Sequence, residues 1–125
     1  NDSRWVHRPA ANLERYSQRS DTGTIAWRVF QGLRDLIELR KALPALTGGK
    51  LEVLDTQNRS VLGFYRLNKD GEVLILANFS ERDHAIPEWV VKQHLLDQKN
   101  ILFGKAEYAE SGTLWLPAYA CVVFG

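Results

Sequence analysis

Side chains that could carry acid–base chemistry are few and scattered along this sequence. The three histidines are His7, His84 and His94, and only His84 has carboxylates beside it, at Glu81 and Asp83. A catalytic site needs several such groups converging in one cleft. A charged run of this kind is more often a solvated loop, so each histidine is interpreted as a surface or loop residue. No residue of this chain is predicted to be catalytic.

Nucleophile, metal and cofactor motifs are also missing from the sequence. Cys121 stands in an apolar run, which favours a buried, unreactive thiol over a nucleophile. A single cysteine excludes an internal disulfide, and no Cys/His spacing indicates zinc. No glycine-rich phosphate loop or metalloprotease motif is present. We therefore expect neither a metal nor a cofactor. Three Asn-x-Ser sequons occur, at Asn1, Asn58 and Asn78, and the last falls inside a predicted strand, where chance explains it.

Aromatic side chains offer a different chemistry, because exposed rings stack on sugar faces. Trp89, Trp115 and Tyr119 lie in the strand-rich part of the chain. A domain of this size needs large side chains in its core, so two of these three are expected to be buried. Trp27 falls on the polar side of a predicted helix. It is expected to pack against residues 1–23 or against parent structure absent from this chain, with a sugar platform as the alternative.

The longest periodic segment is a helix predicted over residues 24–43. Ser20, Asp21, Thr22 and Thr24 are candidate capping residues, and a helical turn is predicted within residues 11–19. The apolar arc covers roughly 180°, against roughly 100° for an ordinary surface helix. Such a helix should contact two neighbours. In this chain alone, part of its apolar face should be exposed, or covered by residues 1–23 or by a second copy of the chain. That face carries Ile25, Val29, Phe30, Leu33, Leu36 and Ile37.

Arg40 is charged yet lies inside the apolar arc of this helix. A buried guanidinium needs acceptors, so we expect it to be buried against carboxylates or carbonyls of the strand region. The alternative is a side chain that snorkels to water at the helix end. Pro44 and the pair Gly48 and Gly49 are expected to stop the helix.

Residues 50–125 read as short strands separated by turns, which predicts an antiparallel β-sandwich. Residues 72–79 are apolar on both alternating faces, as in a central strand covered on both sides. Gly71 ends a predicted hairpin turn, and residues 89–96 fit either a strand or a short helix. The predicted fold class is mainly β: a sandwich preceded by a loop and one long amphipathic helix.

Composition excludes several classes of protein. With 125 residues, 45% apolar and 25% charged, the chain has the make-up of an ordinary globular domain. A net charge of +1 with interspersed signs does not indicate nucleic-acid binding. No apolar run approaches the roughly 18 residues of a membrane span. The chain contains no methionine, which favours a piece of a larger protein.

Five segments resemble the amylosucrases, sucrose-using members of glycoside hydrolase family 13. The most specific is DSRWVHRP at residues 2–9, followed by QGLRDLIELRKALPAL at residues 31–46. The resemblance extends over nearly the whole chain through GGKLEVLDTQN at residues 48–58, the strand ending ANFSE and the closing LWLPAYACVVF. The DSRWVHRP motif points to the amylosucrase and sucrose hydrolase branch of the family.

The resemblance implies an architecture and one site residue. Residues 1–47 would be the last loop and helix of a (β/α)8 barrel, and residues 48–125 the family's C-terminal β-sandwich, domain C. Arg4 matches an arginine that pairs with an acidic residue of the barrel and helps close the sucrose pocket, so it is the candidate substrate-binding residue. The family's catalytic carboxylates lie on earlier strands and cannot be in this chain.

The resulting hypothesis is a C-terminal fragment of an amylosucrase-like enzyme. The parent would transfer the glucosyl group of sucrose to an α-glucan or to water with retention of configuration. Its partners would be sucrose and α-glucan, with the missing barrel packed on the helix, and neither nucleic acid nor membrane. Two alternatives are an independent carbohydrate-binding β-sandwich, with Trp89, Trp115 or Trp27 as platforms, and the C-terminal domain of an α-amylase or sucrose hydrolase. A third reading is a purely structural interaction module.

Overall fold

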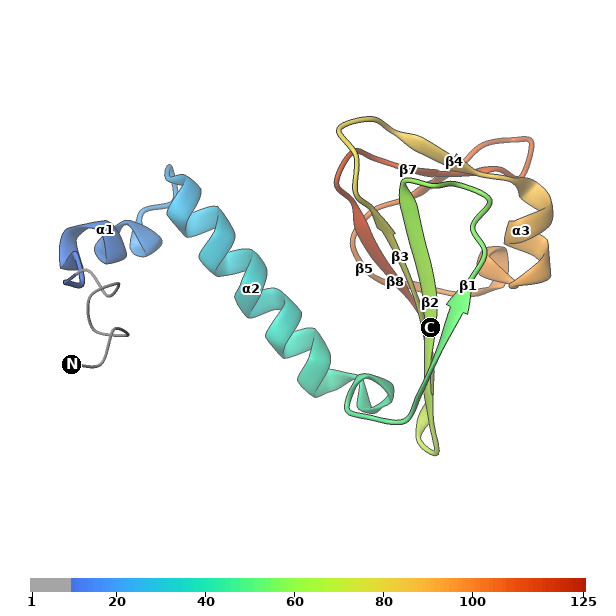
Figure 1. The fold of residues 1–125 in the computed structure, drawn as a ribbon, viewed down its shortest axis with the longest axis horizontal. Helices are drawn as coiled ribbons and strands as arrows, with labels where there is room; N and C mark the ends of the chain where they lie inside the picture. Colours follow the sequence, from blue (N-terminus) through green and yellow to red (C-terminus); the bar gives the residue numbers. More distant parts are fainter. Residues whose placement is uncertain (1–9) are drawn as a thin grey trace, which may run out of the picture. The chain divides into compact units, whose positions relative to one another are not determined.

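The computed structural model describes residues 10–125 and divides the chain into two compact units, residues 1–38 and 39–125 (Figure 1). In the described part of the chain, the first unit is helical and the second holds the strands. The domain boundary predicted between residues 47 and 48 remains a prediction.

Two of the helices have a side-chain cap at their N-terminus. The Asn12 Oδ1 accepts a hydrogen bond from the backbone N of Arg15 at 3.0 Å, and the Thr24 Oγ1 accepts one from the backbone N of Trp27 at 3.0 Å. Thr24 is therefore the cap of the long helix, and the predicted helical turn before it is confirmed. The elements are α1 (Leu13–Ser17), η2 (Gln18–Ser20) and α2 (Ile25–Ala42).

The apolar side of α2 is exposed. None of its residues is buried, and Ile25, Val29 and Leu33 are 70%, 56% and 56% exposed. Leu36 and Ile37 are exposed as well. The prediction that part of this face is exposed in this chain alone is confirmed.

The buried position predicted for Arg40 is wrong. Arg40 and Lys41 are both exposed and lie in the last turn of α2. Cations are favoured there by the partial negative charge of the helix C-terminus. An exposed Arg40 at the helix end agrees with the snorkelling alternative.

A short connection joins α2 to the first strand. α2 ends at Ala42, and Pro44 takes the first position of η3 (Pro44–Leu46), where its missing N–H costs nothing. Gly49 has φ +84°, and a Cβ there would lie 2.1 Å from the Leu67 carbonyl oxygen. Only glycine fits this position, and the predicted stop of the helix is confirmed.

Five antiparallel strands form the larger sheet, in the order β1-β2-β3-β8-β5. Strand β3 lies at its centre, and residues 73–76 are all buried, which confirms the predicted central strand. β2 and β3 form a hairpin that pairs Asn68 with Gly71 across a two-residue turn. The strands are β1 (Lys50–Leu54), β2 (Val61–Asn68), β3 (Gly71–Asn78), β5 (Ile101–Phe103) and β8 (Cys121–Phe124).

A smaller sheet, in the order β4-β7-β6, packs on the larger one. The buried apolar side chains that join the two sheets form one cluster, which we call the main core. Leu114 and Leu116 of β7 are fully buried in that core. Val90 and Val91 of α3 are 0% and 1% exposed and belong to the same core. The predicted antiparallel β-sandwich is confirmed. The remaining elements are β4 (His84–Ile86), α3 (Glu88–Gln93), η4 (Leu96–Gln98), β6 (Glu107–Tyr108) and β7 (Leu114–Leu116).

The face of the larger sheet that points away from the main core is only partly covered, and we call it the outer face. Ala45 is 4% exposed and packs there with Val73, Ile75 and Val123. Farther along the outer face the side chains lack cover. These are Val53, Leu62 and Phe79, which are 72%, 43% and 70% exposed.

Truncation tests which residues the sandwich needs for stability. A chain of residues 39–125 should unfold at the same urea concentration as the 125-residue chain. A chain of residues 48–125 should lose about 3 kcal/mol of unfolding free energy, because it lacks the buried Ala45 and its apolar neighbours. Equal stability of the two truncated chains would show that this cover contributes nothing.

Asn78 ties the end of β3 to the loops that flank the smaller sheet. It is 3% exposed, and its Nδ2 donates to the carbonyl oxygens of Arg82 at 2.7 Å and Pro117 at 2.8 Å. Its Oδ1 accepts from the backbone N of Ser80 at 3.0 Å. Because this amide is buried and fully engaged, its sequon is not available for glycosylation in the folded chain.

Candidate functional site

The predicted substrate-binding residue, Arg4, lies outside the described residues, as does the rest of the DSRWVHRP motif and His7. Its role therefore stays a prediction. Within residues 10–125, no group of three or more His, Cys, Asp or Glu side chains is placed to hold a metal ion. None of the helices described there has the length and hydropathy to cross a membrane.

The charged run around His84 has a structural role. The Asp83 Oδ1 accepts a hydrogen bond from the backbone N of Ala118 at 3.0 Å. The His84 Nδ1 lies 3.1 Å from the Nδ2 of Asn58, and Glu81 is exposed. Residues 81–83 form a loop, as interpreted, whereas His84 is the first residue of strand β4 and pairs with Leu116.

Cys121 opens β8 and is half-buried against the outer-face cluster. Burial raises the pKa of its thiol above the ordinary value, so little thiolate forms at neutral pH. This agrees with the unreactive thiol expected from the sequence.

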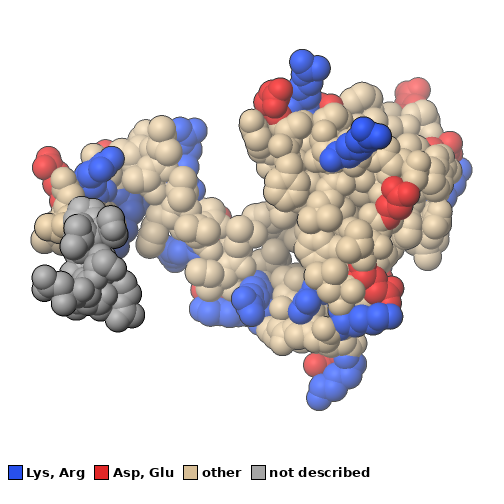
Figure 2. Space-filling model, viewed as in Figure 1, with Lys and Arg blue, Asp and Glu red and all other residues tan. Residues whose placement is uncertain are grey.

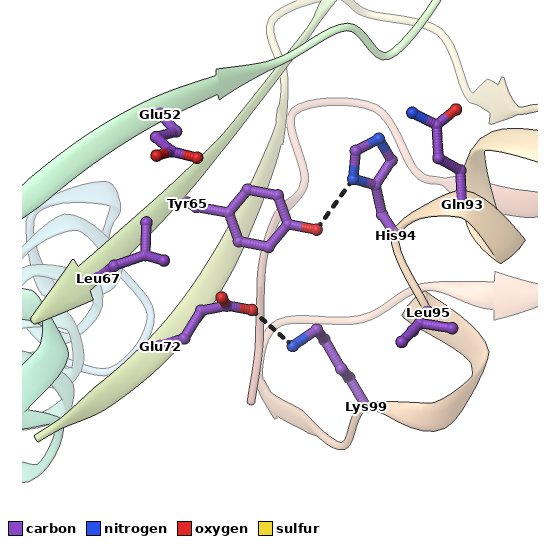
Figure 3. Close-up of a pocket in the computed structure, with 8 residues that line it drawn as sticks. All are labelled: Glu52, Tyr65, Leu67, Glu72, Gln93, His94, Leu95 and Lys99. Carbon is purple, nitrogen blue, oxygen red and sulfur yellow. Dashed lines mark hydrogen bonds and ion pairs between the residues drawn. The ribbon is translucent and has the colours of Figure 1, made fainter.

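A surface pocket of about 370 Å³ lies where strands β1, β2 and β3 meet the end of α3 (Figure 3). Figure 3 shows the Tyr65 ring reaching across it toward His94, with Gln93 beside His94. The Tyr65 hydroxyl lies 3.0 Å from the His94 Nδ1, and the two ring centres are 5.8 Å apart. The full lining is Glu52, Tyr65, Leu67, Glu72, Gln93, His94, Leu95 and Lys99.

Antiparallel register explains why these strand residues meet. Glu52 pairs with Tyr65 across β1 and β2, and Tyr65 pairs with Leu74 across β2 and β3. Leu74 is fully buried in the main core, and Tyr65 packs against that core. The pocket therefore forms where the core-facing side of the larger sheet passes from apolar to polar residues. This is also where α3 ends.

The electrostatic state of the tyrosine–histidine pair follows from its burial. Burial lowers the pKa of His94, while burial and the nearby Glu72 carboxylate raise the pKa of Tyr65. Both groups are therefore neutral near pH 7. A ring protonated on Nε2 accepts the Tyr65 hydrogen bond at Nδ1 and turns its Nε2–H away from Tyr65, as the ring in Figure 3 is oriented.

The charges in the pocket are balanced. The Lys99 Nζ lies 3.0 Å from the Glu72 Oε1, and Glu52 forms an ion pair with Lys50. Over the face shown in Figure 2, acidic and basic side chains of the sandwich are likewise interspersed, without a large patch of one sign. The pocket therefore offers hydrogen-bond donors and acceptors without a strong net field.

Lowering the pH below about 6.5 should reduce the unfolding free energy of the sandwich. The folded state holds His94 neutral because burial lowers its pKa. The unfolded chain therefore binds the proton more readily, and the stability present above the unfolded pKa is lost as pH falls through the folded one. Urea unfolding at a series of pH values should show a shallower decline in His94→Gln. An unchanged decline in that variant would contradict the role of His94.

The sequence reasoning missed this pocket and interpreted His94 as a surface or loop residue. A signal was present, because Glu52 and Glu72 occupy core-facing positions two residues before the buried Leu54 and Leu74. Polar residues in such positions mark the place where a core ends. The partner, His94, comes from a segment that the sequence left open between strand and helix. It caps α3 at its C-terminus.

The prediction that two of the three aromatic residues singled out in the strand-rich part of the chain are buried is wrong. Trp89, Trp115 and Tyr119 are 54%, 44% and 70% exposed. Trp115 alternates with two buried leucines on β7, and the period of a strand places it on the opposite face. In α3 the two valines take the core side. Trp27 is half-buried, and its predicted packing partners remain a prediction.

No family model matches the chain, but solved structures do. A debranching enzyme from Nostoc punctiforme, in a structure soaked with acarbose, is 29% identical over 79% of this chain, with a TM-score of 0.62. An α-amylase from H. orenii is 20% identical over 90%, with a TM-score of 0.63. The trehalulose synthase MutB from Pseudomonas mesoacidophila MX-45 is 21% identical over 82%, with a TM-score of 0.57.

These neighbours are glycoside hydrolase family 13 enzymes. The chain spans only 20%, 22% and 20% of the length of these three family 13 proteins. The fold they share with it is the small two-sheet sandwich of amylase C domains. The likeness is consistent with a fragment of a family 13 enzyme.

Proposed function

We propose that this chain is the C-terminal part of an amylosucrase-like family 13 enzyme. The observation that carries the proposal is the likeness to family 13 enzymes over about a fifth of their length. The DSRWVHRP motif supports the amylosucrase branch. One related structure, of MutB, was determined with sucrose as the substrate.

In this proposal residues 1–47 complete a (β/α)8 barrel and residues 48–125 form domain C. Two exposed apolar surfaces support it. One is the face of α2, where Ile25 is 70% exposed, and the other is the uncovered outer face around Phe79. Apolar surfaces of this kind are usually buried by a partner, and the missing barrel would bury both.

The chemistry of the parent would reside outside this chain. A nucleophilic aspartate of the barrel would take the glucosyl group of sucrose and release fructose, and an α-glucan or water would then accept the glucose. Arg4 would help to close the sucrose pocket, since a guanidinium fork suits carboxylates and sugar hydroxyls. Domain C would contribute structure.

The experiment is an assay of the full-length polypeptide that contains this chain. Incubated with sucrose and glycogen, it should release more fructose than free glucose, because glucosyl groups pass to the glucan. Absence of fructose release, together with cleavage of α-glucan, would refute the amylosucrase assignment and favour an α-amylase type of parent.

A second function, sugar binding by the sandwich itself, is favoured by the exposure of Trp89 and Trp115. The 125-residue chain should then be retained on an amylose resin and eluted by maltose. Free passage through the resin would refute this function and leave the domain with its structural role.

A further inference from the structure

We infer that the pocket between Tyr65 and His94, together with Trp89, is a binding site for a neutral α-glucan. One glucosyl unit would occupy the pocket, and the next would stack on the Trp89 ring. This deepens the second function proposed above, on which the choice of an α-glucan rests.

The polar groups of the pocket suit a ligand rich in hydroxyls and without charge. Both pocket carboxylates already have a lysine partner, and His94 is neutral near pH 7. A charged ligand would have to displace an ion pair, whereas sugar hydroxyls can add hydrogen bonds to the carboxylates and to the His94 ring. The Gln93 amide supplies one donor group and one acceptor beside them (Figure 3).

Aromatic surface lies at both ends of the proposed site. Tyr65 lines the pocket itself. Trp89 precedes Gln93 by four residues in α3, so the two lie on one face of the helix. Trp89 is 54% exposed, so a broad ring is open to solvent one turn from the pocket rim. The apolar C–H face of a sugar ring matches such a surface.

The rim of the pocket is held in place by the core beneath it. Val90 and Leu96, on either side of the rim, are both fully buried. Between them Leu95 adopts a left-handed conformation, with φ 52° and ψ 35°, and its side chain is 51% exposed. A leucine in this conformation is strained, and such strain concentrates at functional sites. Because the backbone is fixed here, binding a ligand would cost little conformational entropy for ordering the loop.

Backbone amide NMR of the 125-residue chain, titrated with maltoheptaose, tests the inference. The amides of Gln93, His94 and Leu95 should shift. Trp89→Ala should weaken binding about tenfold, the effect of losing one aromatic contact. Trp115→Ala, the matched control on the exposed face of β7, should change the Kd less than about twofold. Both tryptophans are exposed, so neither change should unfold the chain.

Three outcomes would overturn the inference. Loss of binding in Trp115→Ala but not in Trp89→Ala would place the sugar elsewhere on the sandwich, while the second function would stand. Equal binding of cellohexaose at the pocket would contradict the choice of an α-glucan. Absence of any shift with maltoheptaose would refute the pocket, and amylose retention would then decide the second function independently.

Discussion

Replacing Asn78 with alanine is expected to lower the unfolding free energy by about 3 kcal/mol, since the buried amide loses several hydrogen bonds that contribute roughly 0.5–1.5 kcal/mol each. The change removes the Nδ2 hydrogen bonds to the carbonyl oxygens of Arg82 and Pro117 and the Oδ1 acceptor of the backbone N–H of Ser80. Urea unfolding of the 125-residue chain measures the loss. Asn78→Asp should be at least as damaging, because a second carboxylate oxygen would face those carbonyls.

Asn68→Ala is the matched control for this prediction. The Asn68 Nδ2 donates to the Pro44 carbonyl at 2.7 Å and its Oδ1 accepts from the backbone N of Asp70 at 2.8 Å, but this pair of contacts is exposed and water can replace it. Its loss should cost less than about 1 kcal/mol. If the two alanine variants were equally stable, the Asn78 network would not be what joins β3 to the flanking loops.

Replacing Arg4 with alanine in the full-length enzyme is expected to reduce kcat/KM for fructose release from sucrose about tenfold to a hundredfold. A hydrogen bond to a charged group is worth roughly 1.5–3 kcal/mol, which corresponds to that range. The proposed role lies in the substrate pocket, so the urea unfolding midpoint should not change.

The control is Arg15→Ala, an identical change at an exposed position in α1. It should leave sucrose turnover within about twofold of the parent, as expected for a surface substitution. Wild-type turnover in Arg4→Ala would refute the assignment of Arg4 to the sucrose pocket.

Local patterns in the sequence predicted the elements well. The both-sided apolar run at residues 72–79 predicted the central strand, and Gly71 predicted its hairpin. Thr24 was among the predicted caps of the long helix, and the exposure of that helix was anticipated from its apolar arc. Each of these features depends on residues close together in the chain.

Composition could not say which aromatic side chains would be buried. It indicated that the core needs large residues, but leucines, valines and Phe124 fill that core instead. Trp115 lies outside the core because the two leucines of β7 face the core and Trp115 lies on the opposite face of the strand. Arg40 was misplaced for a related reason, since no described element covers the end of α2 deeply enough to bury it.

The sequence by itself determined the sandwich, the long helix and the resemblance to family 13 enzymes. Only the tertiary structure decided the Tyr65–His94 pocket, the exposure of the tryptophans and the buried amide of Asn78. Periodicity and turn chemistry depend on residues that are contiguous in the sequence. Register and sheet packing, by contrast, bring together residues such as Glu52, Tyr65 and His94, which no local pattern connects.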